Sequence, residues 1–158
     1  IKGNKFDVVL RKSVELGVET ITPLMTERTV VKTDCNKKIA RWQKIAEESC
    51  KQCGRSSIPK VSGSIIKLDV FCQQGSDADL KLMFWELENE NGLKDINPEK
   101  IPSSVSVLIG PEGGFTIEEV ETARSHGFQT VSLGPRILRA ETAPLVVLSL
   151  LQSKWGDI

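Results

Sequence analysis

Segments with the pattern of β-strands alternate with segments with the pattern of helices along this chain, and this alternation constrains the fold more than any other feature. Strand candidates lie at Glu19–Leu24, Ile58–Val61, Leu80–Trp85, Val105–Ile109 and Gln129–Leu133. Strands separated by helices pair in parallel, because each connection crosses back over the sheet. The predicted fold class is therefore α/β, with a parallel sheet covered by helices on both faces.

Two helices are expected in the first third of the chain. Lys5–Leu16 has apolar residues near helical spacing, and Gly17 can take the left-handed conformation that ends a helix. A longer helix is expected to begin at an N-cap formed by Asp34 or Asn36 and to run to Gly54.

Threonines precede two of the later helical segments. Thr116 followed by Glu119 is the pattern of a capping box, and Thr142 is expected to cap the last helix. The polar stretch Glu86–Ser104 is expected to form a loop of unusual length. The later helices are expected at Lys67–Gln74, Thr116–Gly127 and Ala143–Gln152.

Composition excludes several classes of protein. The 158 residues are 39% hydrophobic and 27% charged, which excludes wholesale disorder. No apolar run approaches the ~18 residues that a membrane span needs. The four cysteines are too few for a disulfide scaffold, and reduced thiols indicate a cytoplasmic protein.

The sequence also lacks the usual motifs of several enzyme classes. It contains no GxGxxG, GxxxxGK[ST] or GxSxG motif, which argues against dinucleotide-binding, P-loop and serine-hydrolase folds. Cys50 and Cys53 form one CxxC pair without a second pair, so no metal site is expected. The single histidine, His126, is expected to cap carbonyl groups at a helix end.

Two glycine-containing segments follow the carboxyl ends of predicted strands, which is where open α/β sheets bind ligands. Ile109–Phe115 reads IGPEGGF, and Leu133–Ala143 reads LGPRILRAETA. Glycines let a backbone turn sharply and approach a ligand closely. The alternatives are a tight turn that binds nothing and, in the second segment, a local ion pair of Arg139 with Glu141, worth only ~0–1 kcal/mol if exposed.

Through these two segments the chain resembles the RsmE-like family of ribosomal RNA uridine-N3 methyltransferases, SPOUT-class enzymes that use S-adenosylmethionine (SAM). The resemblance extends to Lys12–Val18, which looks like the family's KxxELGV helix end, and to Thr26–Arg28, which looks like its TER turn. Arg41–Arg55 is similar to its RWxKIAxEAxxQxGR helix. Ala140 departs from the pattern, since many relatives have Thr there.

The resemblance implies a fold and an assembly that the pattern of elements does not show. It implies one SPOUT methyltransferase domain over residues 1–158, a parallel sheet whose carboxyl-terminal part is tied in a trefoil knot, and a homodimer. Family members carry a PUA-type RNA-binding barrel before this region, and it is absent from this sequence. The chain is therefore expected to be the catalytic part of a longer protein.

The activity implied by the resemblance is SAM-dependent methylation of N3 of a uridine in small-subunit (16S) ribosomal RNA. Arg139 is expected to be catalytic, because a guanidinium stabilises the negative charge that develops on the uracil carbonyl oxygens. Glu141 is expected to orient Arg139 or to take the N3 proton. The alternatives are a non-catalytic RNA- or ribosome-binding module and a SPOUT enzyme that methylates another RNA position.

The two glycine segments are expected to hold SAM through backbone groups and apolar side chains. The expected cofactor-binding residues are Ile109, Gly110, Pro111, Glu112, Gly113, Leu133, Gly134, Ile137 and Leu138.

Several cations are candidates to contact RNA phosphates, with ordinary solvated surface as the alternative. They are Arg11, Lys12, Arg28, Arg55 and Arg136. The formal net charge is zero, with 21 Lys and Arg against 21 Asp and Glu. The chain on its own is therefore expected to bind RNA weakly.

Overall fold

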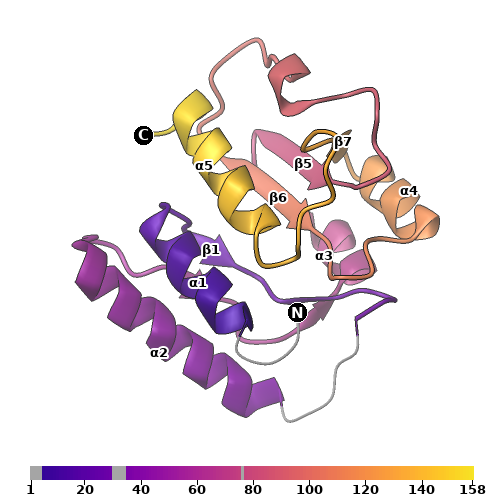
Figure 1. Cartoon of the computed structure of the whole chain (residues 1–158). Helices are drawn as coiled ribbons and strands as arrows, with labels where there is room; N and C mark the ends of the chain where they lie inside the picture. The colour runs from indigo at the N-terminus through magenta and orange to yellow at the C-terminus, as the bar shows by residue number, and fades with distance from the viewer. Residues whose placement is uncertain (1–4, 30–34, 76) are drawn as a thin grey trace. The chain divides into compact units, whose positions relative to one another are not determined.

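The computed structural model describes residues 5–29, 35–75 and 77–158 (Figure 1). The chain divides into two compact units. The first unit comprises residues 1–25, 30–66 and 141–158, and the second comprises residues 26–29 and 67–140.

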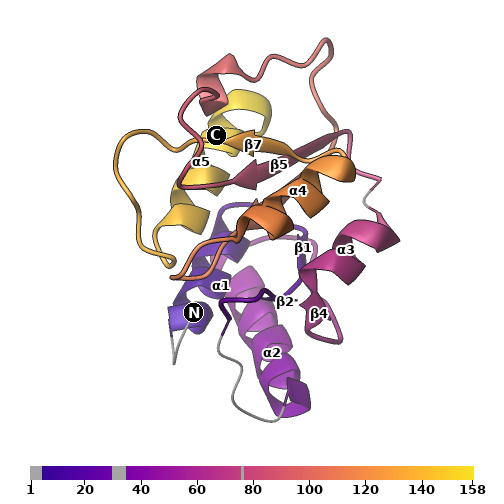
Figure 2. The same ribbon diagram turned by 90° about the vertical axis from the view of Figure 1, so that its right-hand side faces the viewer.

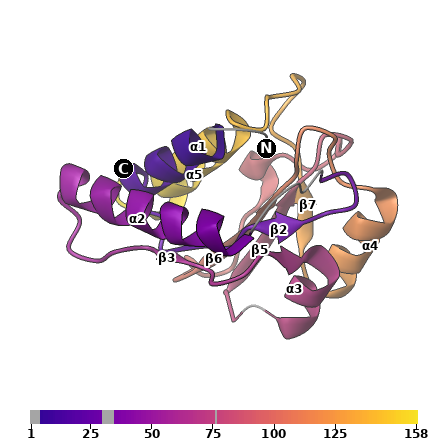
Figure 3. The same cartoon turned by 90° about the horizontal axis from the view of Figure 1, so that it is seen from below.

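The first unit is built on the helices α1, α2 and α5 and on short strand pairs. Helix α1 packs against both α2 and α5, and β1 pairs in parallel with β3. Figures 1 and 3 both show α1 and α2 side by side. The elements are α1 (Lys5–Glu15), β1 (Thr20–Ile21), β2 (Leu24–Met25), α2 (Cys35–Cys53), β3 (Lys60–Val61), β4 (Ile66–Lys67) and α5 (Ala143–Trp155), with β4 reaching the boundary of the unit.

The apolar stripes of α1 and α2 form the core of the first unit. Leu10 and Val14 of α1 are 1% and 0% exposed, because their spacing of four residues puts both on one face of the helix. They pack with Ile45 and Ala46 of α2 and with Val61 of β3. Gly17 ends α1 with φ +86°, as the sequence predicted.

The second unit contains a three-stranded parallel sheet in the order β6-β5-β7. Leu82 and Met83 on the central strand β5 are fully buried. Helices α3 and α4 pack against each other, and Figure 2 shows α4 close to β7. The elements are α3 (Leu68–Gln74), β5 (Leu80–Phe84), the 3₁₀ turn η1 (Leu93–Asp95), β6 (Val105–Ile109), α4 (Ile117–Ser125) and β7 (Gln129–Val131).

The structure confirms the α/β class and the parallel pairing, and it corrects some details. The single strand predicted at residues 19–24 is two strands, β1 and β2, and Pro23 between them has no N–H to donate to a strand neighbour. Asn36 lies inside α2, so it is not the N-cap, and Asp34 lies outside the described residues. Strand β4 was not predicted. None of the helices described is both long enough and apolar enough to cross a lipid bilayer.

Candidate functional site

The loop between β6 and α4, residues 110–116, is called the glycine loop below. Gly114 has φ +68°, a region that L-residues rarely adopt, and its N–H donates to the Pro111 carbonyl at 2.9 Å. Phe115 is 2% exposed, and its ring lies 3.3 Å from the position that a Cβ on Gly110 would occupy. The loop is therefore a tight turn. Position 114 favours glycine because of its positive φ, and position 110 favours glycine because the Phe115 ring leaves little room for a Cβ.

The capping box predicted at the start of α4 is present. The Thr116 hydroxyl accepts from the Glu119 N–H at 3.3 Å, and the Glu119 carboxylate accepts from the Thr116 N–H at 2.9 Å. The backbone N–H of Glu118 and the Thr116 side chain also lower the pKa of the Glu118 carboxyl. These bonds satisfy helix N–H groups that have no partner within the helix, so they fix where the glycine loop ends.

The turn at residues 26–29, called the TER turn below, contacts the glycine loop. The Arg28 guanidinium donates to the Gly113 carbonyl at 2.6 Å, and the Glu27 N–H donates to the Glu119 carboxylate at 2.8 Å. Arg28 was predicted to contact RNA phosphates, and a partner 85 positions away in the sequence was not expected.

Glu86, just after the carboxyl end of β5, reaches the glycine loop. A Cβ placed on Gly114 would lie 1.7 Å from the Glu86 carboxylate oxygen Oε1, so this carboxylate lies directly against the Gly114 backbone. Glu86 was not among the site residues predicted from the sequence. Its position after the central predicted strand was the available signal, because the carboxyl ends of parallel strands lie at one edge of a sheet.

The second glycine-containing segment follows β7. The Ser132 N–H donates to the Asn91 carbonyl at 2.8 Å, and Gly92 forms a parallel bridge with Ser132. Gly134 has φ +96°, and its N–H donates to the Ser132 hydroxyl at 3.2 Å. The chain then becomes exposed, and the Ile137 side chain is 84% exposed.

A buried carboxylate supports this region, and the sequence analysis did not identify it. Glu88 is 6% exposed; its carboxylate accepts from the Thr130 hydroxyl at 2.5 Å and from the Glu90 and Asn91 N–H groups at 2.9 and 3.2 Å. Arg124 donates to the same Thr130 hydroxyl at 2.7 Å. The Thr130 hydrogen bond lowers the pKa of Glu88 most, the two N–H groups add to this, and burial opposes it.

The predicted catalytic residues are two positions apart in the sequence but fall in different units. Arg139 is exposed and belongs to the second unit, and Glu141 belongs to the first. The Glu141 carboxylate forms an ion pair with Lys5 of α1, with 2.9 Å between Oε1 and Nζ.

The predicted RNA-binding cations of the first unit have different surroundings. Arg11 and Lys12 are exposed on α1, and Lys12 forms an ion pair with Glu15 at 2.7 Å. Arg55 is half-buried, and its guanidinium donates to the Val14 and Val18 carbonyls at 3.0 and 2.7 Å. Arg55 therefore ties the end of α2 to the end of α1.

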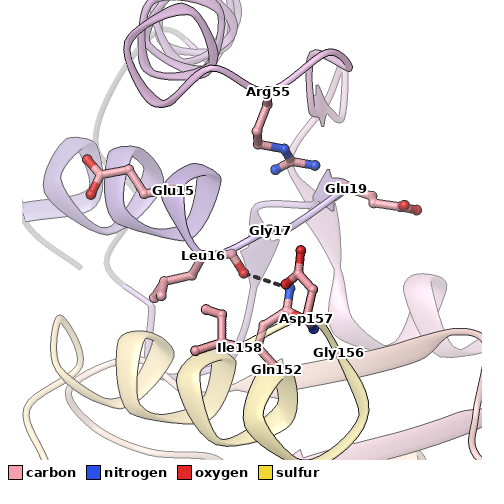
Figure 4. Close-up of a pocket in the computed structure, with 9 residues that line it drawn as sticks. All are labelled: Glu15, Leu16, Gly17, Glu19, Arg55, Gln152, Gly156, Asp157 and Ile158. Carbon is pink, nitrogen blue, oxygen red and sulfur yellow. Dashed lines mark hydrogen bonds between the residues drawn. The ribbon is translucent and has the colours of Figure 1, made fainter.

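A cavity of about 470 Å³ lies in the first unit (Figure 4). Its walls carry four charged side chains, and Gln152 donates across it to the Leu16 carbonyl at 2.9 Å. Arg55 is the residue of the predicted sites that lines it. The lining residues are Glu15, Leu16, Gly17, Glu19, Arg55, Gln152, Gly156, Asp157 and Ile158.

His126 lies at the end of α4, and the two cysteines of the CxxC pair lie on α2. The His126 ring nitrogen Nδ1 lies 2.8 Å from the Thr122 carbonyl, which confirms that this residue caps the end of α4. Cys50 is buried and Cys53 is exposed on α2. Within the described part of the chain, no group of three or more His, Cys, Asp and Glu side chains could hold a metal ion.

Comparison with known proteins identifies relatives for nearly the whole chain. Two relatives are the ribosomal RNA small subunit methyltransferases E of Buchnera aphidicola and Bacillus subtilis, each 37% identical, with alignments that cover 99% and 95% of this chain. The chain spans 61% of the length of each relative. It is thus shorter than the proteins it matches.

Two solved structures are also similar. One is a methyltransferase from Legionella pneumophila in complex with the cofactor SAM, with a TM-score of 0.91 and 42% identity. The other is the ribosomal RNA small subunit methyltransferase E of Neisseria gonorrhoeae bound to SAM, with a TM-score of 0.89 and 40% identity. Each comparison covers 99% of this chain and 64% of the other. The model of the RNA methyltransferase domain matches residues 1–152, and the chain belongs to this RNA methyltransferase family.

Proposed function

We propose that this chain is the SAM-binding, catalytic portion of an enzyme that methylates N3 of a uridine in small-subunit ribosomal RNA. The observation that carries the proposal is the match of residues 1–152 to the RNA methyltransferase domain, together with 40% identity to a SAM-bound small-subunit methyltransferase. The assignment of N3 rests on the motif resemblance.

The glycine loop and the segment after β7 have the features of a SAM site. Both follow carboxyl ends of parallel strands, and the exposed Ile137 is available as an apolar wall. The Gly113 carbonyl and the Gly134 N–H have hydrogen-bond partners within the protein, which hold the two segments in their turns. The residues proposed to hold SAM are Ile109, Gly110, Pro111, Glu112, Gly113, Leu133, Gly134, Ile137 and Leu138.

SAM supplies an electrophilic methyl group when it is bound. Arg139 is proposed to donate hydrogen bonds to a uracil carbonyl oxygen, where negative charge develops as the N3 proton leaves. Glu141 is proposed to accept that proton or to orient Arg139. Its carboxylate also forms an ion pair with Lys5 of α1.

We also propose which residues contact RNA and how the protein assembles. Exposed Arg11, Lys12 and Arg136 are proposed to contact phosphates, and half-buried Arg55, which donates to the Val14 and Val18 carbonyls, is proposed to add to them. Arg28 donates to the Gly113 carbonyl and is not counted among these contacts. The trefoil knot and the homodimer are proposed on the motif resemblance.

Arg139→Ala in the full-length protein tests this function. Methylated nucleosides of small-subunit RNA are identified by mass spectrometry, and SAM binding is measured by calorimetry. We expect the methylation rate to fall ~100-fold or more with SAM affinity retained, because the variant removes charge stabilisation at the reacting base. Lys94→Ala, which removes an exposed cation elsewhere in the second unit, is the matched control.

Three results would contradict the proposal or a part of it. Near-normal methylation by Arg139→Ala would remove Arg139 from catalysis. Wild-type protein that does not bind SAM would point to a non-catalytic RNA-binding module, and a methyl group at another nucleoside position would replace the uridine-N3 assignment.

A further inference from the structure

The TER turn belongs to the second unit, although the chain on both sides of it belongs to the first. Thr26 is 6% exposed, and its hydroxyl lies 2.6 Å from the hydroxyl of Thr29. The Thr29 N–H donates to the Thr26 carbonyl at 3.0 Å. The turn therefore has its own internal hydrogen bonds, and it can act as a fixed support.

Two hydrogen bonds join this support to the glycine loop and to the first turn of α4. Arg28 donates to the Gly113 carbonyl at 2.6 Å, and the Glu27 N–H donates to Glu119 at 2.8 Å. Glu119 is also the residue that closes the capping box of α4. The TER turn thus contacts the glycine loop at Gly113 and helix α4 in its first turn.

The Arg28 side chain also packs along Gly113. A Cβ on Gly113 would lie 3.1 Å from the Cβ and 3.3 Å from the Cδ of Arg28, closer than side chains normally approach. Glycine at position 113 therefore gives room to the Arg28 stem. The charge of Arg28 further lowers the pKa of Glu118 in the first turn of α4.

We propose that Arg28 is a positioning residue, which holds the glycine loop in the shape that binds SAM. The orientation of its guanidinium supports this role over a role as a phosphate contact, because Nη1 is directed to a backbone carbonyl of the loop. The proposal rests on the proposed function, since it takes the glycine loop to be part of the SAM site.

Arg28→Ala and Arg28→Lys in the full-length protein test this inference, with Lys94→Ala as the control for loss of one exposed cation. Three quantities are measured: hydrogen exchange of the amides at residues 112–116, SAM affinity by calorimetry, and affinity for small ribosomal subunits at fixed salt. Thermal unfolding verifies that each variant is folded.

We expect Arg28→Ala to speed amide exchange in the loop and to weaken SAM binding roughly tenfold, because a charge-assisted hydrogen bond is lost. Arg28→Lys is expected to weaken SAM binding several-fold, because an ammonium lacks the planar fork of the guanidinium. Affinity for ribosomal subunits is expected to stay within about twofold for both variants.

The opposite pattern overturns the proposal. In that pattern Arg28→Ala weakens binding to ribosomal subunits, whereas Arg28→Lys binds them like the wild type. Amide exchange at residues 112–116 and SAM affinity in both variants then match those of Lys94→Ala. If the wild-type protein does not bind SAM, the proposed function fails. The exchange measurement still decides whether Arg28 holds the loop, and unchanged exchange in Arg28→Ala rejects the positioning role.

Discussion

Gly114 and Gly134 both have positive φ, but the space around them differs. A Cβ on Gly114 meets the Glu86 carboxylate, whereas a Cβ on Gly134 meets no atom within 4 Å. Glu86 is exposed, and its carboxylate is the end of a flexible side chain, so it can rotate away. The backbone conformation should therefore dominate the cost of an alanine at both positions.

We predict that Gly114→Ala and Gly134→Ala lower the free energy of unfolding by similar amounts, about 1–2 kcal/mol each. Urea denaturation of both variants measures this. Adding Glu86→Ala to Gly114→Ala should recover no more than a few tenths of a kcal/mol. A recovery above about 1 kcal/mol would show that Glu86 is fixed against the loop and that the steric overlap dominates.

The two glycine-containing segments could be identified from the sequence, but their supporting residues could not. Glycines after a strand are visible because the signal is local. Arg28 and Glu88 act on residues 85 and 42 positions away, and such pairings depend on which strands become neighbours. For the same reason the hydrogen bonds of Arg55 to the end of α1 could not be predicted from the sequence.

At the scale of elements, the two predicted threonine caps differ in the structure. Thr116 has extended φ and ψ and accepts a hydrogen bond from Glu119, whereas Thr142 has helical φ and ψ and makes no capping bond. Both have the sequence of an N-cap. The Thr142 prediction was wrong about the side chain, because its backbone conformation does not direct the hydroxyl at the helix N–H groups.

We predict that Thr116→Ala lowers the free energy of unfolding by about 1 kcal/mol and that Thr142→Ala lowers it by less than about 0.5 kcal/mol. The two variants remove the same atoms from the same helical position, so each is the control for the other. Chemical denaturation measures both. Equal losses would contradict the assignment of a capping bond to Thr116 alone.

The Glu88 carboxylate joins three elements of the second unit: the loop after β5, strand β7 through Thr130, and helix α4 through Arg124. Its pKa is below the ordinary value of 4.5. A carboxyl whose pKa is lower in the folded state than in the unfolded state stabilises the fold at pH values above the unfolded-state pKa. That contribution is lost as the pH falls through the lower, folded pKa.

We therefore predict that the stability of the wild-type chain decreases as the pH falls below about 4.5 and that Glu88→Gln makes this decrease shallower. At neutral pH, Glu88→Gln should cost about 1–3 kcal/mol, because buried donors lose a charged acceptor. Glu90→Gln, at an exposed neighbour, is the control and should leave the pH profile unchanged. Denaturation series at several pH values measure both, and identical profiles for the two variants would remove Glu88 as a source of the pH dependence.

The long elements could be predicted and the shortest could not. Strand β6 has the predicted bounds, and α1 ends one residue before the predicted end, because continuous apolar or periodic patterns define them. Strands β1 to β4 have two residues each, and two residues carry no measurable alternation. Their existence depends on pairing with distant segments.

At the scale of the whole molecule, parallel pairing could be inferred but the strand order could not. The chain passes from β5 to β6 on one side and then to β7 on the other side of β5. Alternating strands and helices fit several such orders equally well. The order matters for the site, because it places the loops after β6 and β7 on both sides of the central strand, where Glu86 follows β5.

The net charge of zero leads to a prediction for the 158-residue chain as a whole. Affinity for RNA falls with salt in proportion to the number of phosphates neutralised. Exposed Arg11, Lys12 and Arg136 supply few contacts. With about two to four phosphate contacts, the slope of log K against log salt should lie near −1.5 to −3, with weak binding at physiological salt. Filter binding to ribosomal RNA over a salt series measures the slope.

Arg11→Ala should make this slope shallower by about one, because it removes one phosphate contact, and Lys94→Ala should leave it unchanged. A slope steeper than about −5 for the wild-type chain would mean that a neutral average conceals a concentrated basic surface. The net charge would then have been the wrong quantity from which to judge RNA binding. A slope in the expected range would mean that this chain neutralises few phosphates and supplies little of the binding energy for RNA.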